Sequence, residues 1–189
     1  LQNIKKIGDS SGNRIYSCLD EKMIIGKSSI DKENYDVLVF CIDKAETIKI
    51  PSFVEIIGPF AFKNCCKTKS IEFSEDSKLR LIEKEAFVHS SIKSLKIPPH
   101  VTEICEGCFI ECYKLETIEI PSNSELKIIG KNVFADSCIE YFNIPSSLVE
   151  LKEGWCNGAA YLTKIGVDQN NQRYSIFENK MIVGKSDIK

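Results

Sequence analysis

The sequence predicts an elongated, mostly β solenoid in which short repeats stack to form a parallel sheet along one side. Three observations lead to this fold class. Five successive units of 23 or 24 residues share one pattern, each unit opens with a short apolar strand, and a longer segment near the start recurs near the end. A unit of this length cannot bury its own apolar face, so consecutive units have to stack to make one core.

The regular units have a spacing that alternates between 23 and 24 residues. Their shared pattern is I-x-I-P, then an apolar-x-x-apolar step, then A-F or an equivalent, then Cys or Ser. The five units begin at Ile48, Ile71, Leu95, Ile118 and Phe142, and a sixth would begin at Ile165. We therefore expect equivalent residues to recur at the same place on successive rungs of the solenoid.

The pattern of one unit predicts its path. The two aliphatic residues of I-x-I lie on one face of a short strand. The proline ends that strand because it has no amide to donate to the ladder. The apolar step starts the return, and the A-F segment turns the corner as a short irregular or 3₁₀ turn.

One aromatic residue per unit supports this register. We expect Phe62, Phe87, Phe109 and Phe134 to form a single interior column. In the fifth unit Trp155-Cys156 stands where the third unit has Cys108-Phe109, so the bulk moves to the neighbouring position. Packed cores tolerate such volume-conserving exchanges.

The longer segment is a duplication. Residues 4–31 and 162–189 match without a gap at an offset of 158, and thirteen of the paired residues are identical. Both copies contain N-x-x-Y followed by an apolar run, at 13–26 and at 171–184. Because the same unit appears at both ends, the repetition favours a parent protein that continues in both directions.

The units resemble the BspA-like leucine-rich repeats, whose signature is I-P-x-x-V-x-x-I-x-x-x-A-F-x-x-C-x-x-L, and in particular the protist type of this surface-protein family. The resemblance covers nearly the whole chain and implies a leucine-rich-repeat solenoid. It also implies a β-hairpin insertion at each N-x-x-Y motif. The departures are Trp155-Cys156 and the two extra residues before each Phe in the 24-residue units.

We expect a single domain over residues 1–189. It comprises a first, irregular unit with a hairpin over 4–47, five regular repeats over 48–164, and a second, truncated unit with a hairpin over 165–189. Composition agrees with one soluble core: 43% of residues are hydrophobic, 28% are charged and the net charge is −2. We expect no nucleic-acid partner and no membrane insertion, and we recognise neither a signal peptide nor an anchor.

Two short motifs resemble catalytic or nucleotide-binding sequences. Gly26-Lys27-Ser28 ends like a P-loop, but the required glycine five residues earlier is replaced by Glu21. Residues 8–12 fit G-x-S-x-G, but the second copy has no serine there, and both histidines lie many rungs away. We interpret both motifs as turns, and expect no nucleotide and no catalytic residues.

The nine cysteines include Cys105-x-x-Cys108-x-x-x-Cys112, which has roughly the spacing of a metal site with His100 nearby. The repeat register instead favours packing. It aligns Cys108 with small residues in the other units, and it aligns Cys112 with Cys65 in a column that the family resemblance places inward. We therefore expect no metal and no cofactor, and the one disulfide worth checking joins Cys112 and Cys138.

The outer face of the sheet is the candidate protein-binding surface. Its positions between the paired aliphatic residues alternate in charge, and one aromatic residue lies beside them. The alternative is a solvated face whose charges pair with each other. A second candidate surface is the pair of hairpins, Tyr16–Gly26 and Tyr174–Gly184. The residues of the first surface, here called the polar face, are Lys49, Glu72, Lys96, Glu119, Tyr141 and Asn143.

The function that these observations favour is that of a non-enzymatic protein-interaction module. The family resemblance implies a surface-exposed protein used in adhesion or in binding host proteins, with extracellular-matrix or host-cell surface proteins as partners. The alternative is an intracellular protein–protein scaffold of the same fold, which the unpaired-looking cysteines favour. An enzyme would require a catalytic role for Ser10 or Lys27.

Overall fold

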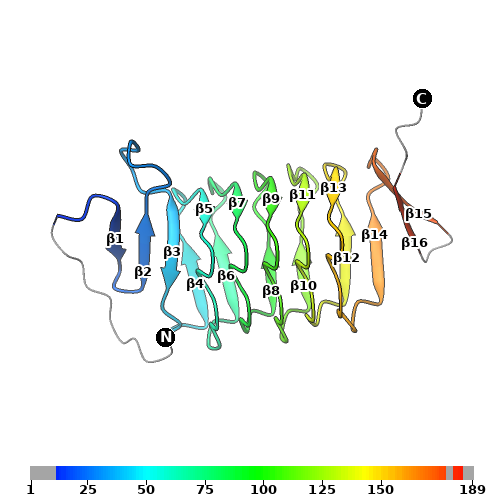
Figure 1. Ribbon diagram of the computed structural model, residues 1–189, viewed down its shortest axis with the longest axis horizontal. Coiled ribbons are helices and arrows are strands. Elements are labelled where there is room, and N and C mark those ends of the chain that lie inside the picture. Colours follow the sequence, from blue (N-terminus) through cyan, green and yellow to red (C-terminus); the bar gives the residue numbers. More distant parts are fainter. Residues whose placement is uncertain (1–11, 178–180, 185–189) are drawn as a thin grey trace.

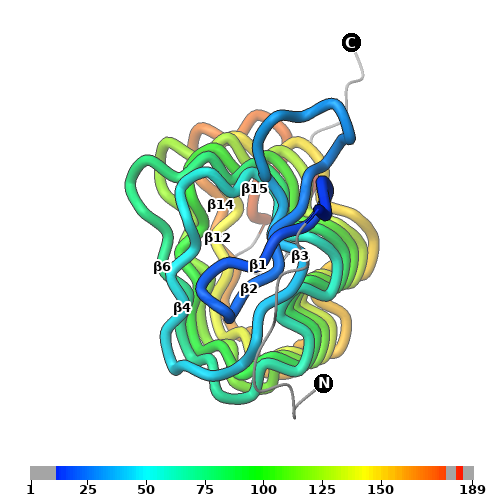
Figure 2. The backbone as a smooth tube through the Cα atoms, turned by 90° about the vertical axis from the view of Figure 1, so that its left-hand side faces the viewer, coloured from blue at the N-terminus to red at the C-terminus, as the bar shows by residue number. Residues whose placement is uncertain are grey.

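The computed structural model describes residues 12–177 and 181–184. These residues form an elongated solenoid whose strands lie across its long axis, with the N-terminal hairpin at one end and the C-terminal hairpin at the other (Figure 1). Viewed along that axis, successive rungs superimpose (Figure 2). The described residues contain strands and turns but no helix, and the predicted solenoid is confirmed.

The first parallel sheet contains the I-x-I motifs. Its order is β14-β12-β10-β8-β6-β4, and its register aligns the predicted unit starts, as in Ile48↔Ile71 and Leu95↔Ile118. In the five regular units the first residue of the motif is buried while its neighbours point outward, as the alternation predicts. The strands are β4 (Thr47–Ile50), β6 (Ser70–Phe73), β8 (Ser94–Lys96), β10 (Thr117–Glu119), β12 (Tyr141–Ile144) and β14 (Lys164–Val167).

A second sheet is formed by the apolar steps, where the sequence predicted only a return segment. The last residue of the step is buried in the first four regular units, as for Ile82 and Ile104, so the backbone beside it must find hydrogen-bond partners in the neighbouring rungs. Its parallel strands are β3 (Val37–Cys41), β5 (Ile56–Ile57), β7 (Leu81–Ile82), β9 (Glu103–Ile104), β11 (Ile128–Ile129) and β13 (Glu150–Leu151).

The A-F segments form a third hydrogen-bonded side without being strands. The amide of Phe87 donates to the carbonyl of Cys108 at 2.9 Å, and that of Phe109 donates to Val133 at 2.8 Å. The segments are irregular turns rather than 3₁₀ helices. In each, the residues two before and two after the aromatic have φ of 53–63°: Phe60, Asn64, Glu85, His89, Gly107, Glu111, Asn132 and Asp136.

The aromatic column is confirmed. The rings of Phe62, Phe87, Phe109 and Phe134 are fully buried and nearly parallel, with centroids 4.9, 5.2 and 5.5 Å apart. Trp155 continues the aromatic packing, with its ring 5.4 Å from that of Phe142 and 6.1 Å from that of Phe134. One interior file of rings therefore ties the rungs together.

Both hairpins are present, and an asparagine positions each one. β1 (Tyr16–Leu19) pairs with β2 (Met23–Gly26), and β15 (Tyr174–Phe177) pairs with β16 (Met181–Gly184). Asn13 Oδ1 accepts hydrogen bonds from the amides two and three residues later, and Asn171 Oδ1 does the same at 2.7 Å each. This explains the asparagine of the N-x-x-Y motif as a turn cap.

The two hairpins differ in their pairing. β2 pairs antiparallel with β3, so the first hairpin extends the second sheet in the order β1-β2-β3-β5. β15 and β16 instead form a two-stranded sheet of their own in the described part of the chain.

Candidate functional site

The structure places all six residues of the polar face on the first sheet. Lys49, Glu72, Lys96 and Glu119 project outward from successive strands, because each lies between two inward residues. Lys49 Nζ lies 3.6 Å from Glu72 Oε2, and Lys96 is the direct cross-strand neighbour of Glu119. Such exposed pairs contribute only about 0.2–1 kcal/mol, so they leave the charges available to a partner.

A row of hydroxyl groups runs beside these charges. It consists of Thr47, Ser70, Ser94 and Thr117, which are aligned across four strands. Thr47 Oγ1 and Ser70 Oγ are 2.8 Å apart and hydrogen-bonded. The sheet therefore presents two parallel polar rows on a backbone that is held rigid by its ladders.

Tyr141 is the aromatic residue of this face, and 39% of it is exposed. Lys164 Nζ lies 5.5 Å from the centre of its ring. A Cβ at Gly166 would lie 2.7 Å from the Tyr141 hydroxyl and 2.4 Å from Asn143 Oδ1. The glycine therefore lets both side chains lie over β14, which orients the ring before any partner binds and lowers the entropy cost of using it as an anchor.

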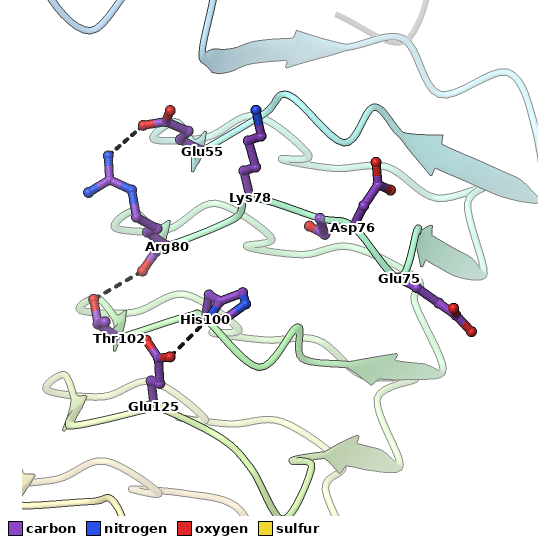
Figure 3. A pocket seen from close by; sticks show the side chains of 9 residues that line it. Glu55, Glu75, Asp76, Lys78, Arg80, His100, Thr102 and Glu125 are labelled. Carbon is purple, nitrogen blue, oxygen red and sulfur yellow. Dashed lines mark hydrogen bonds and ion pairs between the residues drawn. The ribbon is translucent and has the colours of Figure 1, made fainter.

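A charged groove that the sequence analysis missed lies where the chain passes from the first sheet to the second (Figure 3). Its volume is about 440 Å³. Arg80 Nη2 lies 2.5 Å from Glu55 Oε2, and His100 Nδ1 lies 3.0 Å from Glu125 Oε1. The Arg80–Glu55 ion pair and the hydrogen bond between His100 and Glu125 therefore each link two adjacent rungs.

The Gly-Lys-Ser tripeptide has a structural role in the loop between β2 and β3. Lys27 Nζ donates to the carbonyl of Lys32 at 2.8 Å, and the Ser28 amide and hydroxyl donate to the buried Asp36 carboxylate at 2.8 and 2.6 Å. Burial opposes ionisation of Asp36, but hydrogen bonds from Lys32 and Ser28 outweigh it and lower its pKa. A Cβ at Gly26 would lie 2.9 Å from Val39 Cγ2.

The other predicted motif, Gly8-Asp9-Ser10-Ser11-Gly12, lies outside the described residues except for its last glycine. The two histidines are in the described part. His89 Nδ1 lies 3.4 Å from Glu111 Oε2, and His100 pairs with Glu125 in the groove.

The cysteines of the proposed metal spacing are packing residues. Cys108 is fully buried in the predicted column with Ala61, Ala86 and Val133. Cys105 is half-buried, and burial raises the pKa of Cys112 to about 11, which disfavours the thiolate that a metal would need. The described residues contain no group of three or more His, Cys, Asp or Glu side chains suited to a metal ion.

The structure shows no disulfide at Cys41, Cys65, Cys105, Cys108, Cys112, Cys138 or Cys156. Cys112 Sγ donates to the carbonyl of Phe87 at 3.0 Å and lies 3.5 Å from Ser90 Oγ. Ser137, three residues after Phe134, fills the position that corresponds to Cys112 on the next rung, and Cys138 follows it in the chain. The Cys112–Cys138 pair that we expected to check is therefore not a disulfide.

Short stacked rungs with one I-x-I strand each and a shared interior column define a leucine-rich-repeat solenoid. The profile of the BspA-type leucine-rich repeat region matches residues 36–163 in six copies. The chain belongs to this family. Repeats of this family are protein-interaction modules and are typically non-enzymatic.

Solved structures of bacterial proteins are similar to this chain. The pneumococcal vaccine antigen PcpA is 25% identical over 74% of this chain and 34% of its own, with a TM-score of 0.71. A T. pallidum leucine-rich repeat protein is 20% identical over 84% of this chain and 71% of its own, with a TM-score of 0.64. This chain thus spans about a third of the length of PcpA.

A leucine-rich cell surface protein from Faecalibacterium prausnitzii is 17% identical over 94% of this chain and 60% of its own, with a TM-score of 0.59. Likeness at this level shows the shared fold. No curated protein matches this chain. Nowhere in residues 12–177 and 181–184 is there a helix long and apolar enough to span a bilayer.

Proposed function

We propose that this chain is a non-enzymatic binding module of a surface-exposed protein, and that it binds extracellular-matrix or host-cell surface proteins through its polar face. The observation that carries the proposal is the placement of Tyr141 and Asn143 over Gly166, beside two polar rows on a rigid sheet. The face thus combines one oriented aromatic residue with exposed polar groups, which is the composition of an interface anchor and its surroundings.

The charge pattern supports a protein partner of mixed charge. Lys and Glu alternate along the face, so it has no strong field of one sign that would favour nucleic acid or an anionic bilayer. Surface exposure is supported by relatives that are described as a vaccine antigen and as a cell surface protein. The family itself supports protein binding over catalysis.

The test uses the purified chain against a panel of immobilised matrix and epithelial surface proteins. We expect at least one panel protein to bind, and Tyr141→Ala to weaken that binding by about 30-fold, the effect of a typical interface anchor. Tyr113→Ala is the matched control, because Tyr113 is 58% exposed but lies in the turn before β10 and is not part of the polar face. A panel without any binder, or binding that Tyr113→Ala weakens and Tyr141→Ala does not, would contradict the proposal.

The second candidate is an intracellular scaffold of the same fold. Cys105, Cys138 and Cys156 are partly exposed and form no disulfide, which favours it, because oxidising compartments promote pairing of accessible cysteines. Thiol titration of the native protein distinguishes the two. Nine reactive thiols after unfolding under non-reducing conditions would favour the scaffold, and paired cysteines would favour an extracellular location.

A further inference from the structure

The two copies of the hairpin differ in what covers their second strand. In the first copy, β2 pairs antiparallel with β3, and the register joins Met23 to Cys41 and Gly26 to Val37. In the second copy, β16 has nearly the same sequence, Met-Ile-Val-Gly against Met-Ile-Ile-Gly. Among the residues that the structure describes, β16 pairs with β15 alone.

Burial at equivalent positions shows the consequence. Ile25 on β2 is 5% exposed, whereas Val183, its equivalent on β16, is 43% exposed. A Cβ at Gly26 would meet Val39 Cγ2 of β3 at 2.9 Å, but a Cβ at Gly184 would meet nothing within 4 Å. The second hairpin thus exposes an apolar surface and a strand edge that the first hairpin has covered.

The solenoid holds the second hairpin in place on its other side. The Tyr174 hydroxyl accepts a hydrogen bond from the Leu151 amide of the end strand β13 at 2.8 Å. Asn171 is buried, and its Nδ2 donates to the carbonyls of Pro145 and Leu148 at 2.6 and 3.1 Å. β15 is therefore anchored against the last regular rung, and the edge of β16 faces away from it.

We propose that the edge of β16 is a docking site for a third, antiparallel strand with the pattern of Val37–Cys41, supplied by the same polypeptide. The pairing would repeat that of β2 with β3, including its bulge between Ile24 and Ile25. The partner needs an apolar residue at the position of Leu38, which is fully buried in the first copy. Backbone hydrogen bonds give such an added strand its affinity, and alternate side chains give it specificity.

The duplication supports a source in the same polypeptide. In the first copy, ten residues separate Gly26 at the end of β2 from Val37 at the start of β3. Lys27, Ser28 and Ile30 of that connection are matched by Lys185, Ser186 and Ile188 in the sequence after β16. Three of the five positions after β16 thus carry the same residue as the equivalent positions after β2, which favours a strand that is connected in the same way.

The test extends the full chain, 1–189, with a second copy of residues 32–47, which continues the 158-residue offset without a gap. Hydrogen exchange of the amides in Met181–Gly184 is compared with and without the extension. We expect at least tenfold slower exchange in the extended protein, because a paired edge protects its amides. An extension carrying Leu38→Asp and Phe40→Asp is the control, and it should give no protection.

Gly184→Val provides an independent control within the chain. Without the extension the variant should exchange like the wild type at β16, because the space around Gly184 is open. With the extension it should lose the protection, because the added side chain would occupy the space of the residue equivalent to Val39. Unchanged exchange at Leu95 and Phe109 would show that the solenoid stays folded in every variant.

Two results would overturn the proposal. One is equal exchange at β16 with and without the wild-type extension. The other is equal protection from a free peptide of residues 32–47 at micromolar concentration, which would show that the edge takes strands from separate molecules. The proposal would be supported if the attached wild-type segment protects the amides of β16 while neither the free peptide nor the Asp-substituted extension does so.

Discussion

Replacing Phe109 by alanine should destabilise the solenoid by about 4–5 kcal/mol. Phe109 is fully buried and lies between the rings of Phe87 and Phe134, at 5.2 and 5.5 Å. Removing roughly 150 Å² of apolar surface at about 25 cal/mol per Å² costs about 4 kcal/mol. Loss of two stacked neighbours places the result towards the upper end of the range of about 3–5 kcal/mol for Phe→Ala.

The assay is denaturant unfolding followed by the fluorescence of Trp155, the one tryptophan, and by circular dichroism. Agreement of the two probes would justify a two-state analysis. Tyr161→Ala is the control, because this residue is 62% exposed and its loss should change the free energy of unfolding by no more than about 0.5 kcal/mol. A loss below about 1 kcal/mol for Phe109→Ala would refute the buried column.

Three further changes test the turns and the loops. Glu85→Gly should stabilise the fold by about 0.5–1 kcal/mol, because Glu85 has φ of 54°. Gly107→Ala, at the same place on the next rung and with φ of 63°, should destabilise it by about 1–2 kcal/mol. Thermal unfolding measures both changes in stability, and changes of the same sign would contradict the argument. Gly130→Ala should lower the free energy of unfolding by about 1–3 kcal/mol, because its Cβ would lie 2.5 Å from the Glu106 amide nitrogen. An unchanged midpoint of denaturant unfolding would show that the rungs are packed less tightly than described. Asp36→Asn should lower the free energy of unfolding by about 1–3 kcal/mol at neutral pH. Because folding lowers the pKa of Asp36 from 3.8, this loss of stability should be complete above about pH 5 and should shrink as pH falls below 3.8. A loss that stays constant down to pH 2 would argue against the ionised carboxylate.

The regular part of the fold could be predicted because its residues carry a repeated signal. The I-x-I motif fixes which side chains face inward, so one aligned position such as Ile48↔Ile71 fixes the register of the whole first sheet. The aromatic column follows from the same alignment. The sequence therefore contains enough information to place the polar face on one side of the sheet.

The second sheet could not be predicted in the same way. Its strands, such as Leu81–Ile82, are two residues long, and a period of two cannot be recognised over two residues. Glu85 and Glu111 adopt positive φ although glutamate rarely does so, which indicates that the rung geometry, rather than local propensity, imposes this conformation. The contact of Ser28 with Asp36 likewise depends on how the loop folds back.

The candidate site is less fully determined by sequence than the fold. The alternation of Lys and Glu predicts an exposed face, but the orientation of Tyr141 depends on Gly166 in the next strand, which has no sequence signature of its own. The groove around Arg80 depends on the longer turn of a 24-residue unit, whose shape the spacing alone does not give. Whether the polar face binds a protein stays a prediction.

The most direct test of the stacked-rung architecture is residue-resolved hydrogen exchange on the intact chain. Each rung should show three protected sites, one in each sheet and one at the aromatic turn, and these should recur every 23 or 24 residues. For the third rung the structure places them at Leu95, Ile104 and Phe109, whose amides lie in the two ladders or donate across rungs. Protection that follows this period from Ile71 to Phe142 would support the account, and protection without the period would contradict it.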